Sequence, residues 1–146
     1  MKGLSRALFI FLAAAIVIAV GFIVYLNVVP QKVNKFTEFY ILNANGEAYD
    51  YPQQATVGAP VYIVLGVVNH EYSSARYKID MKMEGVEVGG ADVGTLADRQ
   101  KWEEKVSFIP QVAGEKQSVD FFLYKDGGSE PYLKDPLSLQ LSVIPK

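Results

Sequence analysis

Cysteine is absent from this chain of 146 residues, and histidine and tryptophan occur once each. Without cysteine the chain has no disulfide, no thiolate metal site and no cysteine nucleophile. None of the asparagines is followed by the x-Ser/Thr pattern of a glycosylation acceptor, so N-glycosylation is not expected.

Acidic residues are missing from the part of the chain before Pro30, although the sequence contains 16 of them. The remainder holds 12 basic residues against those 16, a net charge of −4. Nucleic-acid binding needs a concentrated basic face. We therefore expect no nucleic-acid partner.

Charge is also absent from residues 7–29, which hold fifteen Leu, Ile, Phe and Val side chains. As a helix this run would extend about 35 Å, against a hydrocarbon core of about 30 Å. Insertion of those side chains is worth about −5 to −9 kcal/mol in total. The run predicts a single transmembrane helix, with membrane lipid as its surroundings.

An uncleaved signal anchor is the form of membrane helix that this run favours. Small-x-small patterns, the usual cleavage signal, occur at 13–15 and 19–21, but the apolar run continues beyond both. The basic flank 1–6 is expected in the cytoplasm and the remainder outside the cell membrane. Ala15 and Ala19, one helical turn apart, are candidates for a helix-packing face.

After a polar tether at 30–35, the hydrophobic period changes from helical to two. Turn residues at 43–46 and 125–131 and a loop at 50–60 separate apolar or alternating runs. Glu104 interrupts one alternation, and we expect it at a strand end or a bulge. A short edge piece is expected at Val86–Val88. The predicted strands are 36–42, 61–68, 77–84, 86–88, 102–108, 119–124 and 137–143.

About seven strands without an amphipathic helix predict a mainly β domain over 36–146. At this length an immunoglobulin-like antiparallel β-sandwich buries both inner faces, and a small barrel is the alternative.

Several short motifs occur in an order typical of one family. They are Phe36-Thr-Glu-Phe-Tyr40, Asp50-Tyr-Pro52, Val57-Gly58, Gly66-Val-Val-Asn-His-Glu-Tyr72, Trp102-Glu103, Phe108-Ile-Pro110, Gly114-Glu115, Phe122-Leu-Tyr-Lys-Asp-Gly127 and Pro131-Tyr132. Over roughly 36–144 the chain resembles a mainly archaeal family of uncharacterised membrane proteins, catalogued as a domain of unknown function. It is also similar to the immunoglobulin-like adhesion repeats of archaeal and bacterial surface proteins. The resemblance implies a fold and a cell-envelope location, and no activity.

The candidate residues for chemistry are few. His70 is the single imidazole, so a metal site around it would need carboxylate partners. No G-x-S-x-G pattern marks a serine nucleophile. Asp126, Glu130 and Asp135 offer oxygens for Ca²⁺, but their spacing differs from the twelve-residue calcium loop and suits a turn. We therefore expect no enzyme activity, no metal and no cofactor.

Aromatic and polar residues near the predicted turns are the candidates for a partner surface. Trp102 shares the parity of Val106 and Phe108, so it is either a core anchor or part of that surface. The tyrosines exceed what a core requires. The candidate surface residues are His70, Glu71, Tyr72, Trp102, Tyr124, Asp126 and Tyr132.

Two functions remain open at this stage. The first is a membrane-anchored, extracytoplasmic binding or accessory module that contacts another envelope or membrane protein. The second is a filament subunit of the type IV pilin or archaellin kind, because Lys2-Gly3 before the apolar run resembles a prepilin-peptidase site with Leu4 as the first mature residue. Arg6 would then lie in a filament core, where an unpaired charge is costly. The first function is therefore preferred.

Overall fold

The computed structural model describes residues 2–29 and 34–146, and it places side chains from Ser5 onward in the first of these segments. The chain divides after Asn34 into two units, which are described separately. Most of the predicted tether, residues 30–33, lies outside the described residues.

The first unit is helix α1, Lys2–Val28. Its part Ser5–Val28 is long and apolar enough to cross a membrane, a property that a signal sequence shares. The side chains from Ser5 to the helix end are all exposed, including those of Ala15 and Ala19. The large apolar side chains of the helix are thus exposed along its length, for example those of Leu8, Ile16 and Leu26.

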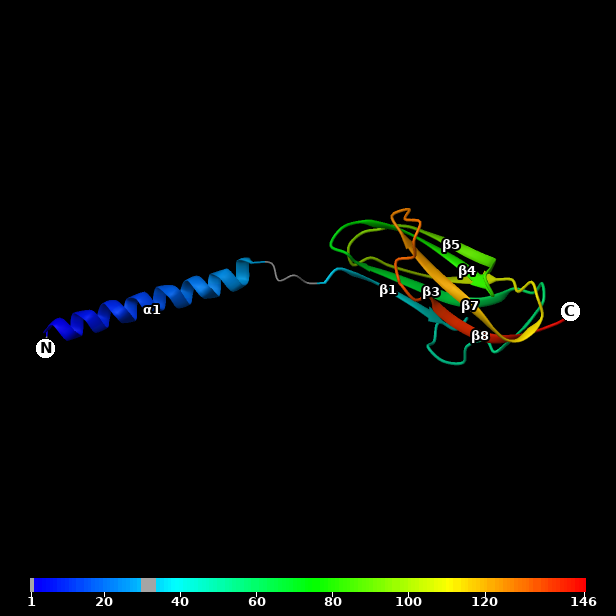
Figure 1. The fold of residues 1–146 in the computed structure, drawn as a ribbon, viewed down its shortest axis with the longest axis horizontal. Coiled ribbons are helices and arrows are strands. Elements are labelled where there is room, and N and C mark those ends of the chain that lie inside the picture. Colours follow the sequence, from blue (N-terminus) through cyan, green and yellow to red (C-terminus); the bar gives the residue numbers. More distant parts are fainter. Residues whose placement is uncertain (1, 30–33) are drawn as a thin grey trace. The chain divides into compact units, whose positions relative to one another are not determined.

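The second unit is mainly β. Within the described residues it contains β1 (Phe36–Leu42), β2 (Gln54–Thr56), β3 (Val61–His70), β4 (Ala75–Met83), β5 (Val86–Leu96), β6 (Lys101–Phe108), β7 (Gly114–Lys125) and β8 (Leu137–Ile144). The strands form two sheets, with the orders β1-β3-β6 and β2-β8-β7-β4-β5 (Figure 1). The two sheets face each other as an immunoglobulin-like β-sandwich.

The core lies between the inner faces of the two sheets. Alternation along β4 turns Tyr77, Ile79 and Met81 inward, and each is fully buried. Phe108 on β6 meets Phe121 on β7 edge to face, with ring centroids 6.3 Å apart, so this pair joins the two sheets. β3 is buried along most of its length because it is the central strand of the three-stranded sheet.

Three expectations need correction. The segment 50–60 is not all loop, because Gln54–Thr56 forms β2 and brings the strand number to eight. β2 is paired with Ser142–Ile144 of β8, and this pair is parallel in an otherwise antiparallel sandwich. A three-residue strand shows no alternation in sequence, and its place is set only by the neighbouring β8.

The edge piece expected at Val86–Val88 is in fact the eleven-residue β5. Gly89 and Gly90 lie within the strand, opposite Met81 and Asp80. A Cβ at Gly89 would lie 3.1 Å from the Ser107 carbonyl oxygen, so this glycine lets the edges of the two sheets approach closely. The interpretation of these glycines as the end of a short strand was therefore wrong.

Glu104 is not at a strand end or a bulge. It lies in the middle of β6, opposite Leu65, in unbroken register. The carboxylate is nevertheless exposed, since β6 is an edge strand and pairs only with β3. An edge strand can thus carry a charged residue at a position where the alternation along the strand predicts an apolar one.

Gly66 makes room for a tyrosine that crosses the outer face of the three-stranded sheet. The Tyr40 side chain extends from β1 over Gly66, and its hydroxyl donates a hydrogen bond to Glu103 on β6. The pKa of Tyr40 is raised to about 12. The largest cause is burial of the hydroxyl, and the hydrogen bond with the Glu103 carboxylate and its charge add to it. A Cβ at Gly66 would lie 2.0 Å from the tyrosine ring.

Gly66→Ala is therefore expected to lower the free energy of unfolding by about 1–3 kcal/mol, because the ring must leave its place. Chemical denaturation measures this. In the background of Tyr40→Ala the same substitution is expected to cost much less, since the clash is gone. Equal costs in both backgrounds would contradict the contact.

Candidate functional site

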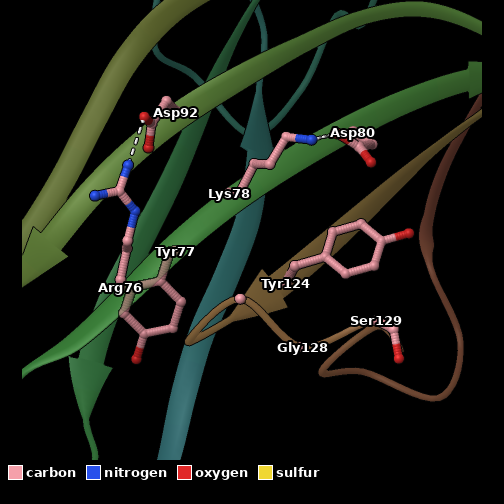
Figure 2. Close-up of a pocket in the computed structure, with 9 residues that line it drawn as sticks. Arg76, Tyr77, Lys78, Asp80, Asp92, Tyr124, Gly128 and Ser129 are labelled. Atoms are coloured by element: carbon pink, nitrogen blue, oxygen red, sulfur yellow. Dashed lines mark hydrogen bonds and ion pairs between the residues drawn. The ribbon is translucent and has the colours of Figure 1, made fainter.

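A cleft of about 480 Å³, lined mainly by charged residues, tyrosines and glycines, lies on the outer face of the five-stranded sheet (Figure 2). Its volume is within the range of about 300–1,000 Å³ that is typical of ligand sites. Strands β4, β5 and β7 and the loop after β7 form it. The lining residues are Arg76, Tyr77, Lys78, Asp80, Asp92, Tyr124, Gly127, Gly128 and Ser129.

Strand register brings the cleft residues into one row. Lys78 on β4 is opposite Asp92 on β5 and opposite Tyr124 on β7. Alternation along β4 then places Arg76 and Asp80 on the same outer face as Lys78. Tyr77 points the other way, into the core, where its hydroxyl is 2.7 Å from Thr37 Oγ1.

Two ion pairs lie in the cleft. Arg76 Nη2 is 2.9 Å from Asp92 Oδ2, and Lys78 Nζ is 3.0 Å from Asp80 Oδ1. The hydrogen bond with Asp80 raises the pKa of Lys78, so this ammonium is charged throughout the physiological range. Such exposed pairs contribute little to stability. Their side chains are thus available to a ligand at small energetic cost.

The loop after β7 is held against β4 at the rim of the cleft. The Arg76 amide donates to Asp126 Oδ1 at 2.9 Å, and the Asp126 amide donates to the Arg76 carbonyl at 2.7 Å. Asp126 and Gly127 take left-handed backbone conformations, with φ of 53° and 69°, which turn the chain over the sheet. In Figure 2 this loop carries Gly128 and Ser129 along one side of the Tyr124 ring.

A second cluster is buried at the end of the sandwich where β1 begins. Glu71, 5% exposed, accepts hydrogen bonds from Tyr132 at 2.6 Å and from Thr37 at 3.0 Å. Lys125 Nζ lies 3.3 Å from its other oxygen. These contacts connect β1, the β3–β4 turn, β7 and the segment before β8. We call this cluster, Glu71 with Thr37, Lys125 and Tyr132, the clamp.

The clamp makes stability depend on pH. Burial would raise the pKa of Glu71, but hydrogen bonds from Tyr132, Thr37 and Lys125, together with the Lys125 charge, outweigh it and hold the pKa below the ordinary value of 4.5. The folded chain therefore binds this proton less tightly than the unfolded chain does. The stabilisation is present above pH 4.5 and is lost as the pH falls through the folded-state pKa.

We expect the Tm of the wild-type protein to fall as the pH is lowered through this window. The Tm of Glu71→Gln should fall less, because that side chain does not titrate. Thermal unfolding followed by circular dichroism at a series of pH values checks this. Parallel profiles for the two proteins would show that another group dominates acid unfolding.

The seven residues predicted for a partner surface do not form one surface, although Glu71 and Tyr132 are hydrogen-bonded to each other. Tyr124 lines the cleft, and Asp126 holds the loop at its rim. Glu71 is buried, and the half-buried Tyr132 donates a hydrogen bond to it. Glu71 is therefore not a surface residue, since three side chains close over its carboxylate. Trp102 is half-buried and packs against the core, so of the two predicted roles, core anchor or partner surface, it has the first.

His70 and Tyr72 flank Glu71 in the chain and are not among the residues that line the cleft. His70 ends β3, is stacked on Phe36 with ring centroids 4.6 Å apart, and has Nε2 3.2 Å from Glu38 Oε1. Tyr72 is exposed in the turn that follows, with φ of 59°. Among the described residues no group of three or more His, Asp or Glu lies close enough to hold a metal ion.

The sequence did not single out Arg76, Lys78, Asp80 or Asp92. Alternating charges on a strand are typical of any solvated face, and Asp92 lies in a glycine-rich stretch that was not expected to be a strand. The available signal was the alternation Arg-x-Lys-x-Asp from Arg76 to Asp80 combined with the Asp-Gly-Gly turn that follows Tyr124. The pairing of β4 with β7, which the sequence does not reveal, brings these two segments together.

Solved structures share the sandwich architecture. The crystal structure of a CARDB domain from Pyrococcus furiosus, in complex with di-metal ions, has a TM-score of 0.53 at 11% identity and covers 77% of this chain and 96% of its own. The solution structure of that domain gives a TM-score of 0.52 at 11% identity, with 76% and 98% covered. A β-glucosidase from Listeria innocua gives 0.50 at 10% identity, and the match spans 77% of this chain and 16% of the enzyme. At these identities the likeness concerns the fold alone.

No curated protein sequence matches the chain. The model of one protein family, described as a domain of unknown function, matches residues 30–143. This range contains the cleft residues and all of the β-sandwich except Ile144, the last residue of β8. The chain belongs to the DUF1616 family.

Proposed function

We propose that this protein is a membrane-anchored, non-catalytic binding module of the cell envelope. In this proposal α1 is an uncleaved signal anchor, with residues 1–6 in the cytoplasm and the sandwich outside. The sandwich contacts another envelope or membrane protein through the outer face of its five-stranded sheet. The observation that carries the proposal is the cleft, a hollow lined by ion pairs and hydroxyl groups that the fold itself does not need.

The anchor has its own support. The exposed side chains of α1 include large apolar groups along the whole helix, for example Phe9, Val17 and Ile23. In water this surface would be unfavourable by roughly 25 cal/mol for each Å². A lipid environment removes that cost.

The exposed ion pairs of the cleft support a binding role. Arg76, Lys78, Asp80 and Asp92 make only exposed or partly exposed pairs, and no nucleophile–base pair lies among the lining residues. The single imidazole, His70, is on the other sheet and is engaged by Phe36 and Glu38. This arrangement suits recognition by hydrogen bonds better than catalysis.

Site-specific photocrosslinking in native membranes tests the proposal. A photoreactive amino acid at Ser129, on the rim of the cleft, should give adducts with another envelope or membrane protein. The same amino acid at Tyr62, 51% exposed on the opposite sheet, is the matched control and should give none. The absence of adducts from Ser129, or equal adducts from both positions, would overturn the proposal.

A further inference from the structure

The charges of the cleft are balanced. Its two cationic side chains, Arg76 and Lys78, each face one carboxylate, from Asp92 and Asp80. A phosphate or an acidic peptide would approach these carboxylates, and a cation would approach the guanidinium and the ammonium, so both meet repulsion. The chemistry thus favours a neutral ligand.

The same groups keep unused hydrogen-bonding capacity. A guanidinium has five N–H donors and a carboxylate about four acceptor sites. Within the described residues, Arg76 uses its Nη2 on Asp92, and the other Asp92 oxygen accepts from the Gly94 amide at 3.1 Å. A neutral ligand that both donates and accepts, as a hydroxyl does, can use both kinds of group.

Tyr124 adds an aromatic face to this polar frame. In the view of Figure 2 its ring lies between the Lys78–Asp80 ion pair and Ser129. In the described part of the chain, neither the Tyr124 hydroxyl nor the Ser129 hydroxyl has a hydrogen-bond partner. A half-buried tyrosine of this kind offers an apolar ring surface and a polar tip. Sugar rings present the matching combination of C–H faces and hydroxyl groups.

We infer that the cleft binds a neutral polyhydroxylated chain, a glycan without acidic groups. The inference rests on the proposed function, because it specifies the group that the partner presents at this site. Such a glycan is available from two sources, as a modification of an envelope protein or as a free polysaccharide. Because the cleft has no net charge, binding should depend little on salt.

The first arm of the test uses the full-length chain in lipid nanodiscs and titration calorimetry. The neutral probes are maltohexaose, cellohexaose and mannohexaose, and the charged comparison is a hexagalacturonate. At least one neutral probe should bind saturably with an affinity nearly independent of salt, while the hexagalacturonate should not bind. Arg76→Gln and Tyr124→Ala should each weaken binding roughly tenfold or more.

Two further variants separate recognition from folding. Tyr124→Phe keeps the ring and loses the hydroxyl, so its affinity should lie between those of the wild type and Tyr124→Ala. Tyr62→Ala removes an exposed ring from the other sheet and should bind as the wild type does. Equal losses in Tyr62→Ala and Tyr124→Ala would overturn the assignment to the cleft.

The second arm distinguishes the sources and separates this inference from the proposed function. Membranes are oxidised with periodate, which cleaves vicinal diols, before photocrosslinking from Ser129. Loss of a protein adduct after periodate indicates a glycan that is carried by a protein. If Ser129 gives only an adduct without protein, and periodate removes it, the glycan belongs to a free polysaccharide and the protein partner of the proposed function is overturned. If no neutral probe binds and the protein adduct survives periodate, the glycan inference is overturned while the proposed function stands. If Ser129 gives no adduct, the proposed function itself fails.

Discussion

Replacing Glu71 with alanine is expected to lower the free energy of unfolding by about 3 kcal/mol. The carboxylate accepts hydrogen bonds from Thr37 and Tyr132 and pairs with Lys125. Its removal leaves those donors at a site that is 5% exposed, where water replaces the lost contacts poorly. The loss should be large because the clamp joins segments far apart in the sequence.

Urea denaturation followed by Trp102 fluorescence measures this effect. Glu115→Ala is the matched control, because Glu115 is an exposed glutamate on the same strand as Lys125 and should change the free energy of unfolding by less than about 0.5 kcal/mol. Tyr132→Phe removes one donor and should cost less than Glu71→Ala. If Glu71→Ala behaves like Glu115→Ala, the cluster is not a clamp.

The double substitution Ile16→Asp and Val20→Asp is expected to remove the chain from the membrane fraction. Each aspartate near the middle of a membrane helix costs about 2.5–3.5 kcal/mol, and the lost aliphatic side chains add to that. The total of roughly 6–8 kcal/mol cancels most or all of the about −5 to −9 kcal/mol that favours insertion.

Carbonate extraction of membranes followed by immunoblotting detects this change. Ile16→Leu with Val20→Leu is the matched control and should stay in the membrane fraction. Retention of the aspartate variant would show that α1 is not what holds the chain there. Release of both variants would show that retention in the membrane does not depend on the apolar character of α1.

The parts of the fold that follow from local patterns were predictable. β1 was expected at residues 36–42 and is found at Phe36–Leu42, since an alternating run ends there at the Asn43–Gly46 turn. β8 extends one residue beyond its predicted end. In the turn, Asn43 Oδ1 accepts from the amides of Asn45 and Glu47, which is the local hydrogen bonding that favours asparagine in turns.

The parts that depend on distant segments were not predictable. β2 owes its extended form to β8, and Gly89 of β5 serves the close approach of β6 rather than a turn. The clamp around Glu71 assembles residues from Thr37 to Tyr132, which no spacing in the sequence relates. For the cleft, Tyr124 and Asp126 were among the candidates, but the row Asp92, Lys78, Tyr124 exists only through the register of three strands.

Cysteine accessibility tests the central claim, a sandwich held outside the membrane by α1, most directly. The natural chain has no cysteine, so Ser129→Cys on the rim of the cleft and Gly3→Cys in the amino-terminal flank each carry the sole thiol. Intact cells treated with a membrane-impermeant maleimide should label Ser129→Cys at once and Gly3→Cys only after permeabilisation. Labelling of Gly3→Cys in intact cells, with Ser129→Cys protected, would contradict the claim.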